Sequence, residues 1–353
     1  MNALGRKIAA LIAAEGPITV AQYMTIALHD PEHGYYATRD PFGTDGDFIT
    51  APEVSQMFGE LIGLSLVQAW EDRGRPDFFH LVELGPGRGT LMADMLRAAR
   101  VRPQFLEAAQ ITLVESSPHL RGVQKKTLEG FDIAWHDTLD AVPMGTPVFL
   151  VANEFLDALP IRQFIFAEGG WHERLVSTDA ERLYFGLSPD QAQIPGLPRM
   201  AEDGAVIEIN LPALALAHGL ATRIREDGGA ALFIDYGHAE SAYGNTFQAV
   251  KAHEYADPLE APGDADLTAH VDFGAFARYA RASGAAAGTA TPQGVFLHRL
   301  GIAARATRLK VVAPAEDIDA AVERLTGEDE MGTLFKAIGI THPGTPPIPG
   351  LDP

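Results

Sequence analysis

The sequence contains no cysteine, no long apolar run and little positive charge. Without cysteine, the 353 residues cannot form disulfides, thiolate nucleophiles or cysteine-ligated zinc and iron–sulfur sites. No apolar stretch reaches the roughly 20 residues that span a bilayer. Residues 1–15 carry few basic residues and lack the pattern of a secretory or transit signal. We therefore expect a cytoplasmic protein that does not insert into a membrane.

Acidic residues dominate the charge of the chain. The 47 aspartate and glutamate residues outnumber the 27 lysine and arginine residues, which gives a formal net charge of −20. Nucleic-acid binding depends on basic side chains that neutralise phosphates, so this balance argues against a nucleic-acid partner. A basic partner would be attracted instead. Composition alone favours the simpler interpretation that the acidity keeps the protein soluble.

Short apolar runs alternate with helical stretches after residue 74, which is typical of an α/β fold built from βαβ units around a parallel sheet. Five runs fit the strands of such a sheet, and one further run near the end of the chain resembles a last strand. They cover residues 79–84, 110–115, 133–137, 147–152, 230–235 and 333–340.

The strand pattern predicts where the parts of the chain begin and end. Residues 1–74 have apolar side chains at helical spacing and form a helical N-terminal segment. Residues 75–160 and 205–340 contain the αβ pattern and form the core. Residues 161–204 alternate short strands with a Gly-Gly turn, so we expect an inserted antiparallel meander. The proline-rich residues 341–353 form an extended or disordered tail.

A glycine-rich turn follows the first predicted core strand. Glu83 ends the strand, and Gly85, Gly87 and Gly89 lead into a helix. Glycines let the backbone approach a ligand, and a helix N-terminus stabilises a carboxylate or another anion. A dinucleotide fingerprint would have a small residue where Thr90 stands, and a P-loop would need Gly-Lys-Ser/Thr. The turn instead resembles the first motif of class I methyltransferases, which implies that it cradles the methionine part of S-adenosylmethionine and that Glu83 faces its ammonium.

Two further acids follow the next two strands. Glu115 is placed to accept hydrogen bonds from both ribose hydroxyls of a cofactor, which fits NAD and S-adenosylmethionine alike. Asp137 stands where methyltransferases often place an acid that accepts from the adenine amine. The alternative is that each acid caps the next helix or lies in solvent.

Polar side chains also follow the fourth strand, in the segment Asn153–Pro160. Ligands of open α/β sheets bind beyond the carboxyl ends of the strands, so Asn153, Glu154 and Asp157 are candidate catalytic residues. For an amine or guanidine nucleophile, a carboxylate there would orient the cation and help to remove a proton. The alternative is that Asn153 and Asp157 only cap a turn.

Taken together, these segments resemble the MidA-like methyltransferases. The resemblance extends over most of the chain and also rests on residues 16–24, 33–36, 46–50, 52–59, 235–237, 267–273 and 291–297. It implies a class I, Rossmann-like fold, mostly parallel with an antiparallel last strand, and S-adenosylmethionine as cofactor. For the mitochondrial member of the family, it implies dimethylation of an arginine in a complex I (NADH dehydrogenase) subunit. It further implies that the N-terminal segment walls the active site, with Gly46, Asp47 and Thr50 binding the substrate.

Three functions stay open at this point: a protein arginine methyltransferase, a small-molecule methyltransferase, and an inactive assembly factor that keeps the fold. The intact glycine turn and Glu115 argue against the last. His270 and Asp272 could be read as metal ligands, but a pair without a third ligand is weak and methyl transfer of this kind needs no metal. We expect no metal and assign this pair structural or substrate-positioning roles.

Overall fold

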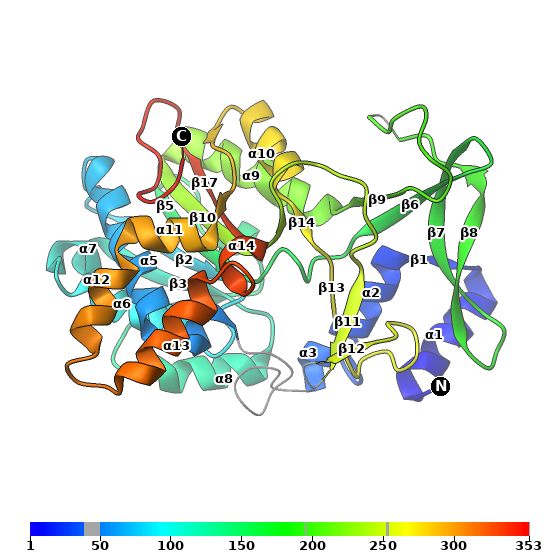
Figure 1. Ribbon diagram of the computed structural model, residues 1–353, viewed down its shortest axis with the longest axis horizontal. Helices are drawn as coiled ribbons and strands as arrows, with labels where there is room; N and C mark the ends of the chain where they lie inside the picture. The colour runs from blue at the N-terminus through cyan, green and yellow to red at the C-terminus, as the bar shows by residue number, and fades with distance from the viewer. Residues whose placement is uncertain (39–49, 195, 252–253, 353) are drawn as a thin grey trace. The chain divides into compact units, whose positions relative to one another are not determined.

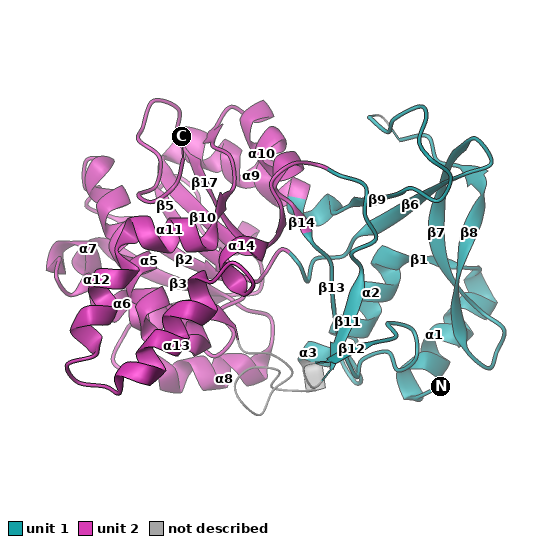
Figure 2. Cartoon of the chain, viewed as in Figure 1, with its two compact units in different colours: residues 1–48, 157–213, 242–270 teal, residues 49–156, 214–241, 271–353 magenta. Residues whose placement is uncertain are grey.

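The computed structural model describes residues 1–38, 50–194, 196–251 and 254–352. The chain divides into two compact units (Figure 2). Unit 1 combines residues 1–48, 157–213 and 242–270, whereas unit 2 combines residues 49–156, 214–241 and 271–353. Among the described helices, none is both long and apolar enough to cross a membrane.

Unit 2 is built on a mixed sheet whose main path runs β15-β17-β10-β5-β2-β3-β4 (Figure 1). Strands β4, β3, β2, β5 and β10 are parallel to one another, and β17 is antiparallel to β10. The predicted sheet with an antiparallel last strand is therefore confirmed. Its strands are β2 (Phe79–Leu84), β3 (Ala109–Val114), β4 (Ile133–His136), β5 (Val148–Asn153), β10 (Gly229–His238), β15 (Ala286–Ala287) and β17 (Phe335–Thr341), with β14 (Val271–Asp272) and β16 (Thr291–Pro292) paired beside them.

Helices cover both faces of this sheet. On one face, Leu81 and Val151 pack in a core with α5 and α6, and on the other Phe233 contacts Phe276 of α10 with ring centroids 4.8 Å apart. The helices are α4 (Ala51–Val54), α5 (Gln56–Asp72), α6 (Thr90–Ala99), α7 (Pro103–Ala108), α8 (Pro118–Thr127), α10 (Phe273–Ala282), α11 (Gln293–Leu300), α12 (Ile302–Leu309), α13 (Ala315–Thr326) and α14 (Met331–Leu334), with a short 3-10 helix at Leu139–Ala141 and α9 (Leu211–Asp227) passing from unit 1 into unit 2.

The last part of the predicted helical segment, from residue 51 to residue 72, forms two helices and not one continuous helix. Ser55 between them has φ −163° and ψ 139°, an extended conformation, and its side chain accepts a hydrogen bond from the amide of Met57. This is the geometry of a serine N-cap, which begins a new helix at the next residue. The break separates α4 from α5, and Glu53 of α4 contacts Thr90, the residue that follows the glycine turn.

Unit 1 contains the predicted meander, and the meander is part of a larger structure. Strands β6, β7 and β8 are antiparallel, as expected, but β1 also pairs with β7 and β9 with β6. Val176 and Leu183 are buried together with Tyr23 and Met24 of α2. A second small sheet, β12-β11-β13, was not predicted. The elements are α1 (Ala3–Glu15), α2 (Val20–His29), α3 (Tyr35–Thr38), β1 (Ile18–Thr19), β6 (Arg162–Ala167), β7 (Gly170–Thr178), β8 (Leu183–Gln191), β9 (Val206–Ile209), β11 (Gln248–Lys251), β12 (Glu254–Ala256) and β13 (Asp266–Thr268).

The C-terminal tail packs against unit 2 through residue 352. Ile348 and Leu351 are buried in the core of that unit. The carbonyl of Pro349 accepts a hydrogen bond of 3.0 Å from the hydroxyl of Ser65, and the carbonyl of Pro346 accepts one of 2.7 Å from Arg73. Two apolar side chains set among prolines thus hold this segment, which contains turns, against unit 2 by burial.

Candidate active site

The glycine turn joins β2 to α6 in a conformation that requires glycine. Gly85, Gly87 and Gly89 have φ of +59°, +52° and +83°, in the left-handed region that other residues rarely adopt. At Gly85, a Cβ atom would lie only 2.8 Å from the ring of Phe155. Gly89 stands at the N-cap of α6 and has no side chain of its own to cap the first amides of the helix. The backbone of the turn is therefore shaped for close approach of a ligand.

Glu83 is a buried acid at the end of β2, next to this turn. Its side chain is 3% exposed, and burial raises the pKa of Glu83 to about 8 even though the backbone N–H of Met92 donates to the carboxylate. Within the described part of the chain, nothing donates to its Oε2 atom. An unsatisfied buried carboxylate is costly. A ligand ammonium would supply the missing partner, so Glu83 fits the amino-acid end of S-adenosylmethionine.

Glu115 is held in place at the end of β3. Its Oε1 atom accepts a hydrogen bond of 2.7 Å from the amide of Ser117, and its Oε2 atom accepts one of 3.3 Å from Gln124. Burial raises the pKa of Glu115, and these two hydrogen bonds oppose that effect. A carboxylate has about four acceptor positions, so an oriented Glu115 can still accept from two ribose hydroxyls.

Asp137 lies at the end of β4 in a different environment. Its side chain is 78% exposed and pairs with Arg121 at 2.7 Å. The Nε atom of Arg121 also donates to the backbone carbonyl of Glu115 at 2.7 Å. Arg121 therefore ties the ends of β3 and β4 together, and the exposed pair with Asp137 contributes little stability. The assignment of Asp137 to the adenine amine stays a prediction.

Asn153 and Glu154 lie together at the end of β5. Glu154 has φ of +51°, a strained value for a residue other than glycine. Its Oε1 atom accepts hydrogen bonds of 3.0 Å from the amide of Ala51 and 2.9 Å from the side-chain amide of Asn153. The Oδ1 atom of Asn153 is buried and has no donor among the described residues. The end of β5 thus presents acceptor atoms, which suits a cationic substrate.

Asp235 supports this turn and was not singled out as a site residue from the sequence. Its side chain is 1% exposed and lies in the C-terminal half of β10. Its Oδ2 atom accepts from the amides of Phe155 and Leu156 at 3.0 and 2.8 Å. Asp235 therefore holds the backbone that follows Glu154. The sequence did offer one indication of a role for Asp235: this acid ends an apolar strand and stands directly before Tyr236 and Gly237.

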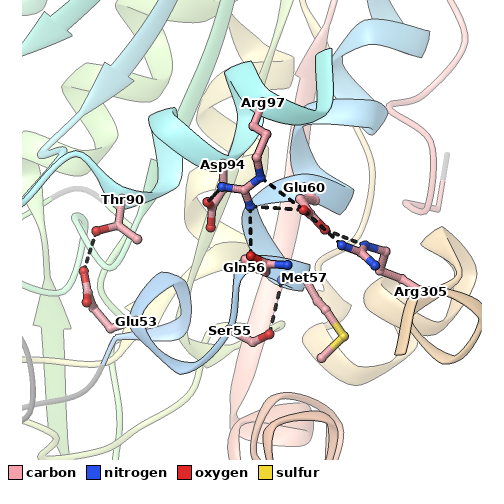
Figure 3. A network of polar contacts seen from close by, with 9 residues as sticks. All are labelled: Glu53, Ser55, Gln56, Met57, Glu60, Thr90, Asp94, Arg97 and Arg305. Atoms are coloured by element: carbon pink, nitrogen blue, oxygen red, sulfur yellow. Dashed lines mark hydrogen bonds and ion pairs between the residues drawn. The ribbon is translucent and has the colours of Figure 1, made fainter. Parts of the chain in front are cut away.

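Helix α4 is tied to the glycine turn and to the end of β5. The hydroxyl of Thr90, the first residue of α6, donates to Glu53 of α4 at 2.6 Å (Figure 3). Ala51 of the same helix donates to Glu154, as above. Thr50, a predicted substrate residue, is the N-cap of α4, and its carbonyl accepts from the amide of Glu53 at 2.8 Å. The other two predicted substrate residues, Gly46 and Asp47, lie outside the described residues.

Beside this tie, α5, α6 and α12 are joined by ion pairs (Figure 3). Glu60 of α5 is largely buried and contacts Arg97 of α6 at 3.0 Å and Arg305 of α12 at 2.6 Å. Burial opposes ionisation of Glu60, but the two arginines outweigh it and lower the pKa of this carboxyl. Arg97 also pairs with Asp94 at 2.6 Å. This network stabilises the position of α6 and hence of the turn that precedes it.

The remaining predicted residues lie elsewhere. Asp157 belongs to unit 1, where its carbonyl accepts from the amide of Ala269 at 3.0 Å and its side chain is buried. Burial, together with the charges of Asp266 and Asp157, raises the pKa of Tyr36. The catalytic role given to Asp157 stays a prediction. Asp272 caps α10 by accepting from the amide of Ala275, which is a structural role.

Comparisons with known proteins agree with these features. A family model described as S-adenosyl-L-methionine-dependent methyltransferase matches residues 61–291. The mitochondrial protein arginine methyltransferase NDUFAF7 homolog of Drosophila melanogaster is 38% identical, with 96% of this chain and 85% of that protein covered. Mitochondrial protein arginine methyltransferase NDUFAF7 of Homo sapiens is also 38% identical, with coverage of 85% and 73%.

Solved structures extend the likeness to three dimensions. A crystal structure from Burkholderia thailandensis with bound S-adenosylhomocysteine has a TM-score of 0.84 and 30% identity, and covers 99% of this chain and 93% of that one. A native structure from the same organism has a TM-score of 0.83, with coverage of 99% and 94%. This chain therefore belongs to the MidA-like family of S-adenosylmethionine-dependent methyltransferases, and S-adenosylmethionine is its cofactor.

Proposed function

We propose that this enzyme methylates an arginine side chain of a protein, and that a subunit of respiratory NADH dehydrogenase is the acceptor. The observation that carries the proposal is the pair Asn153 and Glu154 at the end of β5, a carboxylate beside a buried amide oxygen without a donor among the described residues. The names of the curated relatives support it. The net charge of −20 supports a basic protein partner.

The residues that we expect to contact the cofactor lie at or directly after the carboxyl ends of β2, β3 and β4. In this proposal Glu83 binds the ammonium of the cofactor, and the turn containing Gly85, Gly87 and Gly89 lies against its amino-acid part. Glu115 accepts hydrogen bonds from the ribose hydroxyls, and Asp137 accepts one from the adenine amine. When bound, S-adenosylmethionine supplies an electrophilic methyl group, so the protein has to hold the acceptor nitrogen in line with it.

Arginine places a particular demand on the site. A guanidinium is protonated near neutral pH, so the site has to bind a cation and then accept a proton as the methyl group arrives. Glu154 attracts the cation and accepts that proton, while Oδ1 of Asn153 accepts one guanidinium N–H. Asp235 holds the backbone that follows Glu154 by accepting from the amide of Leu156. The amide of Ala51 donates to the Glu154 carboxylate and orients it.

Glu154→Gln tests the role of the carboxylate. Glutamine keeps an oxygen that can accept from Ala51 and Asn153 but removes the charge, so turnover should fall severely while the affinity for S-adenosylhomocysteine stays nearly unchanged. Glu71→Gln is a matched control, since Glu71 is a carboxylate of the same unit that pairs only with the exposed side chains of Arg75 and Arg102 among the described residues. Equal activity of the two variants, or a joint loss of affinity and thermal stability in Glu154→Gln, would reject the proposed role.

The acceptor class needs a separate test. Labelled S-adenosylmethionine is incubated with the enzyme and a whole-cell lysate, and protein is separated from small molecules. Label in protein arginine supports the proposal, and label confined to small molecules identifies a small-molecule methyltransferase instead. A cytoplasmic location is part of the same proposal, and fractionation of cells that express the tagged chain tests it.

A further inference from the structure

A fully buried glutamine lies behind the cofactor site. Gln124 is on α8 and has no exposed surface, with Leu120 one turn before it and Leu128 one turn after it on the same buried side. Residues four apart share a helix face, so an apolar side chain would be expected at position 124. A buried amide at such a position needs partners to offset its desolvation.

Among the described residues, the side-chain amide of Gln124 contacts the glycine turn, the residue that follows β3, and a residue of β4. Its Nε2 atom donates to the carbonyl of Gly87 at 2.8 Å and to Oε2 of Glu115 at 3.3 Å, and its Oε1 atom accepts from the indole N–H of Trp135 at 2.9 Å. A tryptophan N–H can only donate, whereas a carbonyl and a carboxylate can only accept. The orientation of the amide is therefore fixed by its surroundings.

Gln124 consequently touches both parts of the cofactor site. One donor holds the carbonyl of Gly87, in the turn that faces the amino-acid end of the cofactor. The other holds the carboxylate of Glu115, whose second oxygen is already fixed by the amide of Ser117. The stem of the side chain lies beneath Gly89, where a Cβ atom would come 3.5 Å from Cγ of Gln124.

We propose that Gln124 is a positioning residue that fixes the separation between the glycine turn and the ribose carboxylate, so that both ends of S-adenosylmethionine are recognised at once. The proposal rests on the proposed role of Glu115. Each oxygen of Glu115 accepts one of these hydrogen bonds, from Ser117 or from Gln124, and a carboxylate has about four acceptor positions, so the carboxylate is oriented and can still accept from the ribose. The indole N–H of Trp135 in β4 donates to Oε1 of Gln124 and so fixes the side-chain amide that contacts Glu115.

Gln124→Met tests the proposal, since methionine has a similar length and no hydrogen-bonding amide. We expect affinity for S-adenosylhomocysteine to fall about 10-fold, the scale of one lost hydrogen bond near a charged group. The KM for S-adenosylmethionine should rise, while kcat at saturating cofactor stays within about 2-fold, because the methyl acceptor site is untouched.

A second readout separates positioning from general stabilisation. The native enzyme should bind S-adenosylhomocysteine more tightly than its 2′-deoxy analogue, because Glu115 loses a partner with the analogue. In Gln124→Met this ratio should shrink toward one. Gln293→Met is the matched control: Gln293 is equally buried in unit 2, but its amide donates to the carbonyl of Leu325. That control should lose thermal stability and keep both the affinity and the ratio.

The outcomes distinguish the possible failures. If Gln124→Met loses stability but keeps the native ratio, as Gln293→Met should, the positioning role is wrong while the assignment of Glu115 stands. If Glu115→Ala leaves cofactor affinity unchanged, the proposed site assignment fails and this inference fails with it. Should Gln124→Met not fold, Trp135→Phe decides. It removes the indole donor to Oε1 of Gln124 and leaves a smaller aromatic ring beneath Lys125. A reduced ratio supports the proposal, whereas an unchanged ratio overturns it.

Discussion

Replacing the buried acid Glu83 by glutamine should change how stability depends on pH. Glu83 is 3% exposed, and burial raises its pKa from the ordinary value of 4.5 to about 8. The folded chain therefore holds this proton more tightly than the unfolded chain does. The resulting stabilisation is complete below pH 4.5 and is lost as the pH rises through about 8.

The size of the effect follows from the linkage between proton binding and folding. Each pH unit between the two pKa values changes the free energy of unfolding by about 1.36 kcal/mol. Between pH 5 and pH 8 the native chain should thus lose about 4 kcal/mol relative to Glu83→Gln, which keeps the shape of the side chain and cannot ionise. At pH 5 the two proteins should have similar stability.

Urea unfolding of both proteins at several pH values between 5 and 8 measures this difference. The same series with S-adenosylhomocysteine tests the ligand role: its ammonium should favour ionised Glu83, so stabilisation by the ligand should grow with pH in the native enzyme and stay flat in the variant. Asp94→Asn is a control for which we expect a smaller dependence on pH. Burial raises the pKa of Asp94 only to about 6, because Arg97 opposes the effect. Parallel stability curves for native enzyme and Glu83→Gln would refute the reasoning.

Three other substitutions probe the cofactor site. Gly87→Val should abolish S-adenosylhomocysteine binding in calorimetry while circular dichroism stays native, since φ of +52° and the space for ligand both exclude a branched side chain; retained binding would contradict the site. Glu115→Ala should weaken binding by about 1.5–3 kcal/mol, the range for hydrogen bonds to a charged group, and an unchanged Kd would show that the ribose lies elsewhere. Thr90→Val removes the hydrogen bond to Glu53 and should weaken binding about 5-fold through the glycine turn, whereas thermal stability lost without any change in affinity would argue against that coupling.

The sequence predicted the features that local chemistry controls. Strands β2, β3 and β5 are buried apolar runs, and the residues at their ends follow directly from the chain order. Glu83 and Glu115 could therefore be assigned to the carboxyl edge of the sheet from the order of residues alone. The break at Ser55 was missed because an apolar helical pattern continues on both sides of it.

Contacts between distant segments could not be predicted in this way. Gln124 is polar at an apolar helix position, and its importance emerges only when Gly87, Glu115 and Trp135 are seen around it. Likewise, β1 pairs with β7 through Ile18 and Val176, two residues far apart in the chain. The burial of the tail through Ile348 depends on packing in the same way, since its prolines by themselves indicate only an extended chain.

Protein arginine methylation is the central proposal, and its acceptor can be identified directly. NADH dehydrogenase is isolated from cells that lack the gene, and incubated with S-adenosylmethionine and either the native enzyme or Glu154→Gln. Peptides of each subunit are then examined by mass spectrometry. We predict an arginine that gains methyl groups with the native enzyme and stays unmodified with the variant. Unmodified arginines in every subunit after treatment with active native enzyme would contradict the proposed acceptor.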